Sequence, residues 1–265
     1  MEAIPRHEMA TGRYQHLASR AAVVLIAAGG IAWSLVAADG TSEFYQLDRI
    51  SSLILGGEVI PPESLSPVLA RFDSRPSQEC GRTTVPHAVI RLYLATSASN
   101  GRSPSAPVLL DTAENELRGA LTCSPYQPYL WYGLFWVRMV EGRSPESYIP
   151  PLQESYVMGP RELWISIYRN SDALPLFDRL DLRTQALVRA EYLSLAKEQA
   201  NVAAQTFKNS DHPTRSRLLV WVLDLPIDQR RQLAAALDAA DVVVDIPGVE
   251  YRDGHVILRS QRTAP

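Results

Sequence analysis

The longest apolar run of the chain lies near its N-terminus. Residues 21–38 read AAVVLIAAGGIAWSLVAA and contain no charged side chain. As a helix this run would extend about 27 Å, close to the thickness of the hydrocarbon core of a bilayer. It therefore predicts a transmembrane helix. A cleaved signal peptide ending at the small residues 36–38, or a buried helix of a soluble domain, are the alternatives.

Charged residues flank this run asymmetrically. Arginines precede it and carboxylates follow it: Arg6, Arg13 and Arg20 before, Asp39, Glu43 and Asp48 after. Since positive charge is enriched in cytoplasmic segments, residues 1–20 are predicted to be a cytoplasmic tail. The rest of the chain would then lie on the opposite side of the membrane, as the main domain of a single-pass protein.

After the apolar run, apolar residues recur mainly at the three- and four-residue spacing of helices. Residues 42–104 are predicted to form N-terminal helices and a linker. Residues 105–245 are predicted to form the main helical domain. The expected helices are 42–55, 62–72, 85–97, 105–123, 128–141, 171–180, 181–207, 213–223 and 226–240. The fold class is therefore mainly α.

The pattern changes character at the C-terminus. Residues 249–258 read VEYRDGHVIL, in which Asp253-Gly254 separates two alternating apolar stretches. Asp-Gly between such stretches is typical of a two-residue hairpin turn. Residues 246–265 are therefore predicted to form a small β-hairpin and a tail.

A weak internal sequence repeat relates two parts of the main domain. Leu117, Ala120, Leu121 and Pro125 are matched thirty-five residues later by Leu152, Ser155, Tyr156 and Pro160, and Trp131 by Trp164 after thirty-three. A period near thirty-four resembles the tetratricopeptide (TPR) repeat, in which helical hairpins stack into a right-handed α-solenoid. The resemblance covers residues 105–170. It departs from the pattern at Phe135, which stands at a small-residue position, and at Pro150-Pro151, which are expected to shorten the second hairpin.

The two cysteines have a defined place in this layout. Cys80 precedes the expected helix 85–97, and Cys123 ends the helix 105–123. If these helices are antiparallel neighbours, the two thiols lie close together. The inferred export places them in an oxidising compartment, which predicts a disulfide; two free thiols are the alternative.

Composition and motifs favour binding over catalysis. The formal net charge of −3 shows no basic excess for a nucleic acid, and none of the five histidines has a metal-ligand spacing. The carboxylate pairs Glu114/Glu116 and Asp238/Asp241 are interpreted as solvated helix surfaces. Neither a nucleophile elbow nor a nucleotide-binding loop occurs. We therefore expect no catalytic residue, metal or cofactor, with a site assembled from distant residues as the alternative.

An aromatic segment carries the candidate binding residues. Tyr129, Trp131, Tyr132 and Trp136 lie on the expected helix 128–141 together with Arg138, and Trp164 opens the next repeat. Flat aromatic faces suit both peptide anchoring and stacking on sugar rings. The alternative is a central helix that is buried on all sides.

The runs LTCSPYQPYLWYGLFWVRMVEG, LQESYVMGPRELWISIYRNSDALPLF and VVVDIPGV carry a family resemblance. Over most of residues 45–248 the chain resembles a family of TPR-like inner-membrane proteins of Gram-negative bacteria that accompany exopolysaccharide synthesis and export genes. The resemblance implies a scaffold anchored in the bacterial inner membrane, with its main domain in the periplasm. Its partners would be proteins of an envelope polysaccharide machinery. A glycan-binding accessory protein that contacts the polysaccharide directly is the second hypothesis, and an envelope enzyme is the third.

Overall fold

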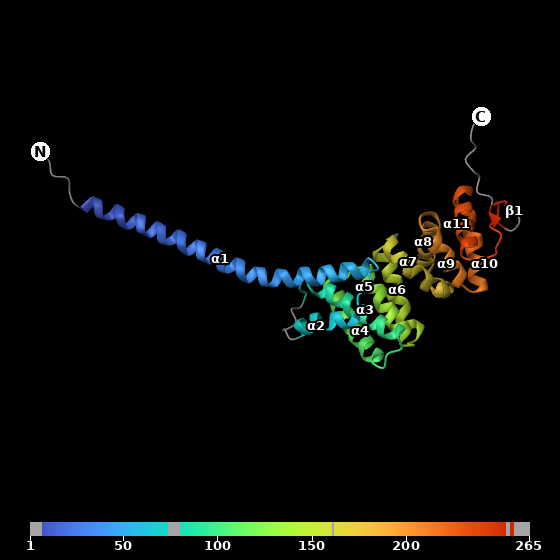
Figure 1. Ribbon diagram of the computed structural model, residues 1–265, viewed down its shortest axis with the longest axis horizontal. Coiled ribbons are helices and arrows are strands. Elements are labelled where there is room, and N and C mark those ends of the chain that lie inside the picture. The colour runs from blue at the N-terminus through green and yellow to red at the C-terminus, as the bar shows by residue number, and fades with distance from the viewer. Residues whose placement is uncertain (1–6, 74–79, 161, 253–254, 257–265) are drawn as a thin grey trace, which may run out of the picture.

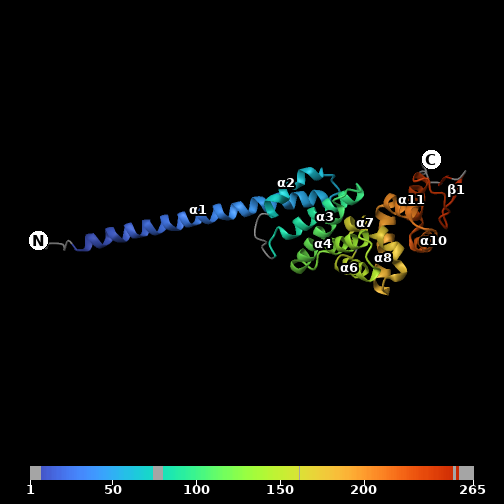
Figure 2. The ribbon, with the colours of Figure 1, turned by 90° about the horizontal axis from the view of Figure 1, so that it is seen from below.

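The computed structural model describes residues 7–73, 80–160, 162–252 and 255–256, and it confirms that the chain is mainly α-helical (Figure 1). One long helix, α1 (His7–Leu55), projects from a body in which the other helices pack together. The second view shows the same arrangement, with α1 leaving one end of the body and the C-terminal helices forming the other (Figure 2).

Helix α1 joins two segments that were predicted separately. The segments 21–38 and 42–55 belong to one uninterrupted helix. Gly40 lies between them, but one glycine costs a helix only about 1 kcal/mol, and no proline occurs between residues 21 and 55. In the part of the chain that is described, no helix holds a stretch long and apolar enough to qualify as a membrane span.

The C-terminal end of α1 is fastened to the body. Leu47 is fully buried and packs with Leu65 and Leu69 of α2 (Pro62–Asp73) and with Ile90 of α3 (Thr84–Asn100). The helix ends in a glycine motif in which the Gly57 N–H donates to the Ile54 carbonyl and the Glu58 N–H donates to the Leu53 carbonyl. Gly57 has a φ of +86°, which a side chain would disfavour. This turn directs residues 58–60 back across the body.

Two helical hairpins follow in the chain. Helix α3 packs along α4 (Ala106–Cys123), and α5 (Pro128–Val140) packs along α6 (Pro145–Met158). A disulfide joins Cys80 to Cys123 with the Cα atoms 5.0 Å apart. The predicted disulfide is therefore confirmed, and it holds the start of α3 beside the end of α4.

Helix α6 corrects the expectation for Pro150-Pro151. Both prolines lie inside the helix, which continues to Met158, so they do not shorten the hairpin. A proline at position 151 cannot donate to the carbonyl of Ser147. The guanidinium of Arg138 donates to that carbonyl instead, at 2.9 Å, so the helix continues without an unsatisfied acceptor there.

The repeated sequence positions occupy equivalent places in the fold. Leu117, Ala120 and Leu121 are buried on α4, as are Leu152, Ser155 and Tyr156 on α6. The Ser155 hydroxyl donates to the Pro128 carbonyl at 2.8 Å, which pins the end of α6 to the start of α5. The body is thus a repeat-like stack of helical hairpins.

The stack continues with further helices that complete the largest hydrophobic core. They are α7 (Leu163–Ala173), the 3₁₀ turn η1 (Leu174–Arg179), α8 (Leu182–Glu198), α9 (Ala200–Asn209), α10 (His212–Trp221), the 3₁₀ turn η2 (Val222–Asp224) and α11 (Ile227–Ala239). Asp181 caps α8 by accepting from the Thr184 N–H at 2.6 Å. The expected helix 181–207 is interrupted at Gln199, and Ser171, expected to start a helix, lies inside α7.

Two short strands close the described chain. The strand β1 (Tyr251–Arg252) pairs antiparallel with β2 (His255–Val256), with Tyr251 opposite Val256. The expected Asp253-Gly254 turn and the end of the predicted segment 249–258 lie outside the described residues. The full hairpin therefore stays a prediction.

Candidate binding cavity

A cavity of about 270 Å³ lies where four parts of the chain meet. Its walls come from the end of α1 and the following turn, from α3, from α5 and from α7. The lining residues are Ile54, Leu55, Gly57, Glu58, Val59, Leu92, Tyr93, Thr96, Tyr129, Tyr132, Gly133, Trp136, Trp164 and Tyr168. Aromatic and aliphatic side chains dominate this list, as in most ligand sites.

Helix α5 contributes one aromatic face to the cavity. Tyr129, Tyr132 and Trp136 follow one another at intervals of three and four residues, so they lie on the same side of the helix. Gly133 lies among them, and a Cβ atom there would be 2.6 Å from the Leu92 Cδ2 atom of α3. The glycine therefore sets how closely α3 approaches α5, and with it the depth of the cavity.

Helix α7 contributes a partly exposed wall. Trp164 and Tyr168 are one helical turn apart and are 38% and 49% exposed. The Trp164 ring lies 5.6 Å from the Tyr129 ring, centroid to centroid, and its indole N–H donates to the Glu162 carboxylate at 3.1 Å. These two residues form an aromatic rim that faces solvent.

Several polar groups of the lining are already paired within the protein. The Tyr132 hydroxyl donates to the Asp172 carboxylate at 2.8 Å. The Tyr93 hydroxyl donates to the Ile60 carbonyl at 2.7 Å and accepts from the Ile60 N–H at 2.9 Å. The Thr96 hydroxyl donates to the Leu92 carbonyl at 2.8 Å.

Burial raises the pKa of three acidic groups in and beside the cavity lining. It raises the pKa of Tyr129, with a smaller contribution from the neighbouring Tyr168. Burial also raises the pKa of Tyr132, with the Asp172 charge adding to the effect. The pKa of Asp172 is itself raised by burial, against the hydrogen bond from Tyr132 that lowers it. The phenols of Tyr129 and Tyr132 are therefore neutral at physiological pH.

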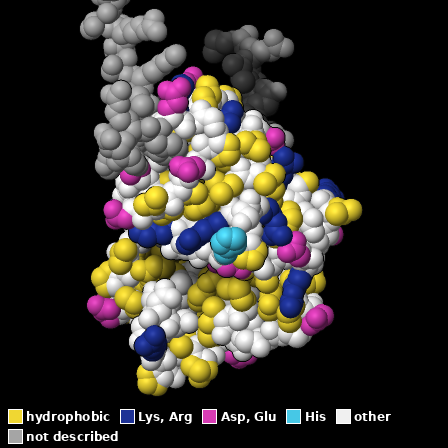
Figure 3. Space-filling model, turned by 90° about the vertical axis from the view of Figure 1, so that its right-hand side faces the viewer, with side chains coloured by type: hydrophobic (Ala, Val, Ile, Leu, Met, Phe, Trp, Pro, Cys, Tyr) yellow, Lys and Arg dark blue, Asp and Glu magenta, His cyan; other side chains and the backbone are white. Residues whose placement is uncertain are grey.

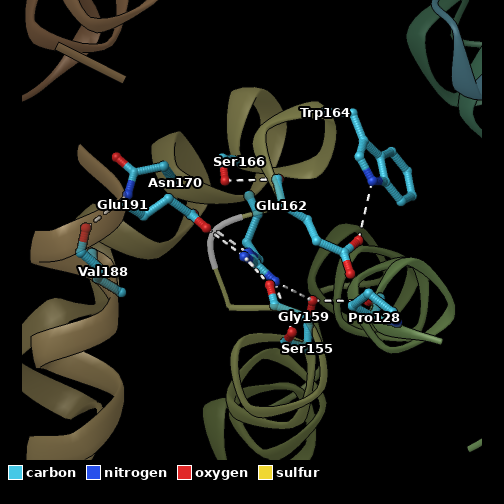
Figure 4. A network of polar contacts seen from close by, with 10 residues as sticks. Pro128, Ser155, Gly159, Glu162, Trp164, Ser166, Asn170, Val188 and Glu191 are labelled. Atoms are coloured by element: carbon cyan, nitrogen blue, oxygen red, sulfur yellow. Dashed lines mark hydrogen bonds and ion pairs between the residues drawn. The ribbon is translucent and has the colours of Figure 1, made fainter. Parts of the chain in front are cut away.

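A buried ion pair positions α7 (Figure 4). The Arg169 side chain is fully buried and pairs with Glu191 of α8, which is also buried. Arg169 also donates to the carbonyls of Ser155 at 2.7 Å and Gly159 at 3.0 Å, and it lies 4.0 Å above the centre of the Tyr156 ring. This network ties α7 to α6 and α8, so it fixes the helix that carries Trp164 and Tyr168.

The structure brings together four of the six predicted binding residues. Tyr129, Tyr132, Trp136 and Trp164 all line the cavity. Trp131 and Arg138 do not. The Trp131 indole N–H donates to the Pro125 carbonyl at 2.7 Å, and Arg138 pairs with Glu114 at 2.9 Å. The alternative of a central helix also holds in part, because Leu130, Leu134, Phe135 and Val137 of α5 are buried.

Sequence reasoning missed other lining residues. Tyr168 was recognisable, because it follows Trp164 by one helical turn. Tyr93 and Glu58 had no such signal, since they reach the cavity only through the packing of α3 and the turn after α1.

The predicted solvated pair Glu114/Glu116 needs a correction. Glu114 is only 4% exposed and pairs with both Arg138 and Arg143. Arginines from α5 and from the loop after it cover this face of α4, which the sequence of α4 alone does not reveal. Glu116 contacts the His87 ring at 3.2 Å, and this interaction lowers the pKa of Glu116.

The end of the body formed by the C-terminal helices has a different surface (Figure 3). Basic side chains gather in a row across this face, among hydrophobic and acidic ones. Arginines of α8, α10 and α11 form ion pairs with aspartates: Arg189 with Asp224, Arg217 with Asp178, and Arg231 with Asp228. The mixed charge of these helices gives no indication of an anionic partner.

Comparison of the chain with protein-family models, with curated proteins and with solved structures found no match. Among the described residues, no group of three or more His, Cys, Asp or Glu side chains is placed to hold a metal ion.

Proposed function

We propose that the protein is a non-catalytic adaptor, anchored in a membrane by residues 21–38, whose helical body binds a partner at the aromatic cavity. The observation that carries the proposal is the cavity itself, with Tyr129, Tyr132, Trp136 and Trp164 in its lining. Concave, largely apolar sites with a few polar groups are the usual places for binding, and aromatic anchors contribute most of the binding energy at protein interfaces.

The exposed surface of α1 supports the anchor. Within residues 22–35 every described side chain is exposed, including Leu25 at 72%, Ile26 at 75% and Trp33 at 76%. In water this apolar surface would cost about 25 cal/mol per Å², whereas a bilayer would cover it. The proposed orientation, with residues 1–20 in the cytoplasm and the body in the periplasm, rests on the arginines before the run.

A fractionation experiment tests the anchor. Replacing Leu25 and Ile26 by Glu should move the protein from the alkali-washed membrane pellet to the supernatant, because charged residues at the bilayer centre are strongly disfavoured. Tyr45→Glu is the matched control, since Tyr45 is 68% exposed on the same helix but outside residues 21–38. Retention of the double variant in the pellet would argue against this anchor.

The hairpin stack supports the adaptor role. Stacked helical hairpins commonly present extended surfaces to partner proteins, and a TPR-like right-handed solenoid is the finer description that we propose. The family resemblance suggests the setting, in which the partners belong to an envelope polysaccharide machinery.

Photocrosslinking tests the adaptor role. A photoreactive residue at position 168, on the rim of the cavity, should crosslink to a component of that machinery in cells. The matched control is position 126, because Tyr126 is 79% exposed but does not line the cavity. Equal crosslinking at both positions, or none at position 168, would contradict the proposal.

Direct glycan binding is the second candidate, and the rim favours it. Trp164 and Tyr168 are partly exposed and present aromatic surface on which sugar rings can stack. Polymer binding that survives Trp164→Ala and Tyr168→Ala in folded protein would exclude this surface as the glycan site.

A further inference from the structure

The cavity lining combines many aromatic side chains with a single charged residue. Six of its residues are aromatic: Tyr93, Tyr129, Tyr132, Trp136, Trp164 and Tyr168. Glu58 is the only charged residue of the lining, which includes no Lys, Arg or His. The site therefore combines a set of π systems with one negative charge and no positive one.

The charge of Glu58 is not neutralised by the protein. Glu58 forms no ion pair or side-chain hydrogen bond with any other residue that the structure describes. The glycine turn at Gly57 and the hydrogen bond from the Glu58 N–H to the Leu53 carbonyl hold its backbone at the edge of the cavity. Glu58 is exposed to solvent at this edge, so its side chain is available to a cation that enters the cavity.

Three hydroxyls of the cavity lining have no proton left to donate to a ligand. The hydroxyls of Tyr93, Tyr132 and Thr96 all donate to protein acceptors. Each of these oxygens can still accept a hydrogen bond from a ligand. A ligand with an apolar surface and a single positive charge suits a lining that is mainly aromatic and carries one acidic residue.

We propose that the cavity binds an alkylammonium group, held by the aromatic side chains and by the Glu58 carboxylate. The inference rests on the proposed function, in which this cavity is the binding site of the adaptor. Aromatic rings attract cations through their quadrupoles, and cages of such rings select methylated ammonium groups. The volume of about 270 Å³ is large enough for one such group with its alkyl chain.

Two soluble probes test the charge of the ligand directly. Choline and its uncharged isostere 3,3-dimethylbutan-1-ol have the same shape, so they separate cation recognition from apolar burial. In calorimetric titrations of the full chain in a non-ionic detergent, choline should bind roughly tenfold more tightly than the isostere. Equal affinity, or no binding of choline, would overturn the inference.

Two variants locate the site. Glu58→Gln should weaken choline binding several-fold and leave the isostere unaffected. Glu63→Gln is the matched control, because Glu63 is an exposed acidic residue of α2 outside the lining. Tyr168→Ala should weaken choline binding, whereas Tyr126→Ala should not. Unchanged choline binding in Glu58→Gln would place the cation elsewhere and overturn the inference.

A third titration separates the two sources of such a group. A capped Gly-Lys-Gly peptide carries the ammonium of a partner protein, and choline represents a small molecule. Tighter binding of the peptide assigns the cavity to a lysine of a partner, and tighter binding of choline assigns it to a methylated amine. If crosslinking at position 168 succeeds while all three probes bind equally, the ligand class is wrong but the adaptor function stands.

Discussion

Arg138 donates a hydrogen bond from Nη1 to the Ser147 carbonyl oxygen at 2.9 Å. That carbonyl would otherwise accept from residue 151, where a proline stands in this helix. The same guanidinium donates from Nε to Glu114 at 2.9 Å. One arginine on α5 thus contacts both α4 and α6, which gives it a structural role; its role in binding stays a prediction.

Removal of this guanidinium should lower the free energy of unfolding of the helical body. Arg138→Met leaves the Ser147 carbonyl unpaired and Glu114 with Arg143 as its remaining partner. We expect a loss of about 2 kcal/mol in the free energy of unfolding, measured by urea denaturation. Arg118→Met is the control, because Arg118 is exposed on α4, and it should change stability by less than about 0.5 kcal/mol. A variant as stable as the control would contradict the role of Arg138.

The stability that the buried ion pair Arg169–Glu191 gives to the folded protein should depend on both side chains. Arg169→Met leaves the Glu191 carboxylate buried without its partner and should cost about 3–5 kcal/mol in denaturant unfolding. The double variant Arg169→Met with Glu191→Leu removes both charges, so it should recover part of the loss. A double variant less stable than the single one would show that the charge of Glu191 is not the source of the effect.

The disulfide should contribute measurable stability. It closes a loop between residues that are 43 positions apart. The chain-entropy model gives about 3–4 kcal/mol for such a loop. The variant with Ser at both cysteines should therefore unfold at lower urea concentration than the oxidised wild type. Addition of a reductant should lower the midpoint of the wild type and leave that of the variant unchanged.

The raised pKa of Asp172 predicts a specific pH dependence. Burial makes the folded state bind this proton more tightly than the unfolded chain does. The contribution of protonated Asp172 to the free energy of unfolding is therefore fully present below the ordinary pKa of an aspartate. It is lost as the pH rises through the raised pKa of the folded state. Asp172→Asn keeps an acceptor for the Tyr132 hydroxyl but does not ionise. Its stability relative to wild type, from urea unfolding at several pH values, should increase as the pH rises. A constant difference would contradict the prediction.

The helix ends were predictable where local signals determine them. Asp181 caps α8 through its own side chain, and Gly57 ends α1 with a positive φ. The pairing of Cys80 with Cys123 was predicted from the expected antiparallel packing of two helices and from the inferred export to an oxidising compartment. By contrast, nothing in the local sequence explains the interruption at Gln199 between α8 and α9.

The cavity was predictable only in part, because most of its walls come from packing. The spacing of Tyr129, Tyr132 and Trp136 on one helix face is visible in the sequence, since a helix fixes it. Tyr93 and Glu58 join them only because α3 and the turn after α1 pack against α5. The burial of Glu114 was missed for the same reason, since its arginine partners lie beyond α4.

Gly133 should control the approach of α3 to α5, and with it the cavity. In Gly133→Ala the new Cβ atom would be 2.6 Å from the Leu92 Cδ2 atom, so the Leu92 side chain must move. We expect a loss of about 1–3 kcal/mol in the free energy of unfolding. Gly119→Ala is the matched control, because nothing lies within 4 Å of its Cβ position on α4. It should stabilise the protein by about 0.4–1 kcal/mol, since alanine favours a helix.

The double variant Gly133→Ala with Leu92→Val distinguishes a steric clash from a general intolerance of alanine at this position. Shortening Leu92 removes the atom that the new methyl group would meet, so the double variant should be more stable than the sum of the two single losses predicts. Strict additivity would mean that Leu92 does not set the contact. Because Leu92 and Gly133 both line the cavity, recovery of stability together with weakened choline binding would show that the spacing of α3 and α5 determines the site.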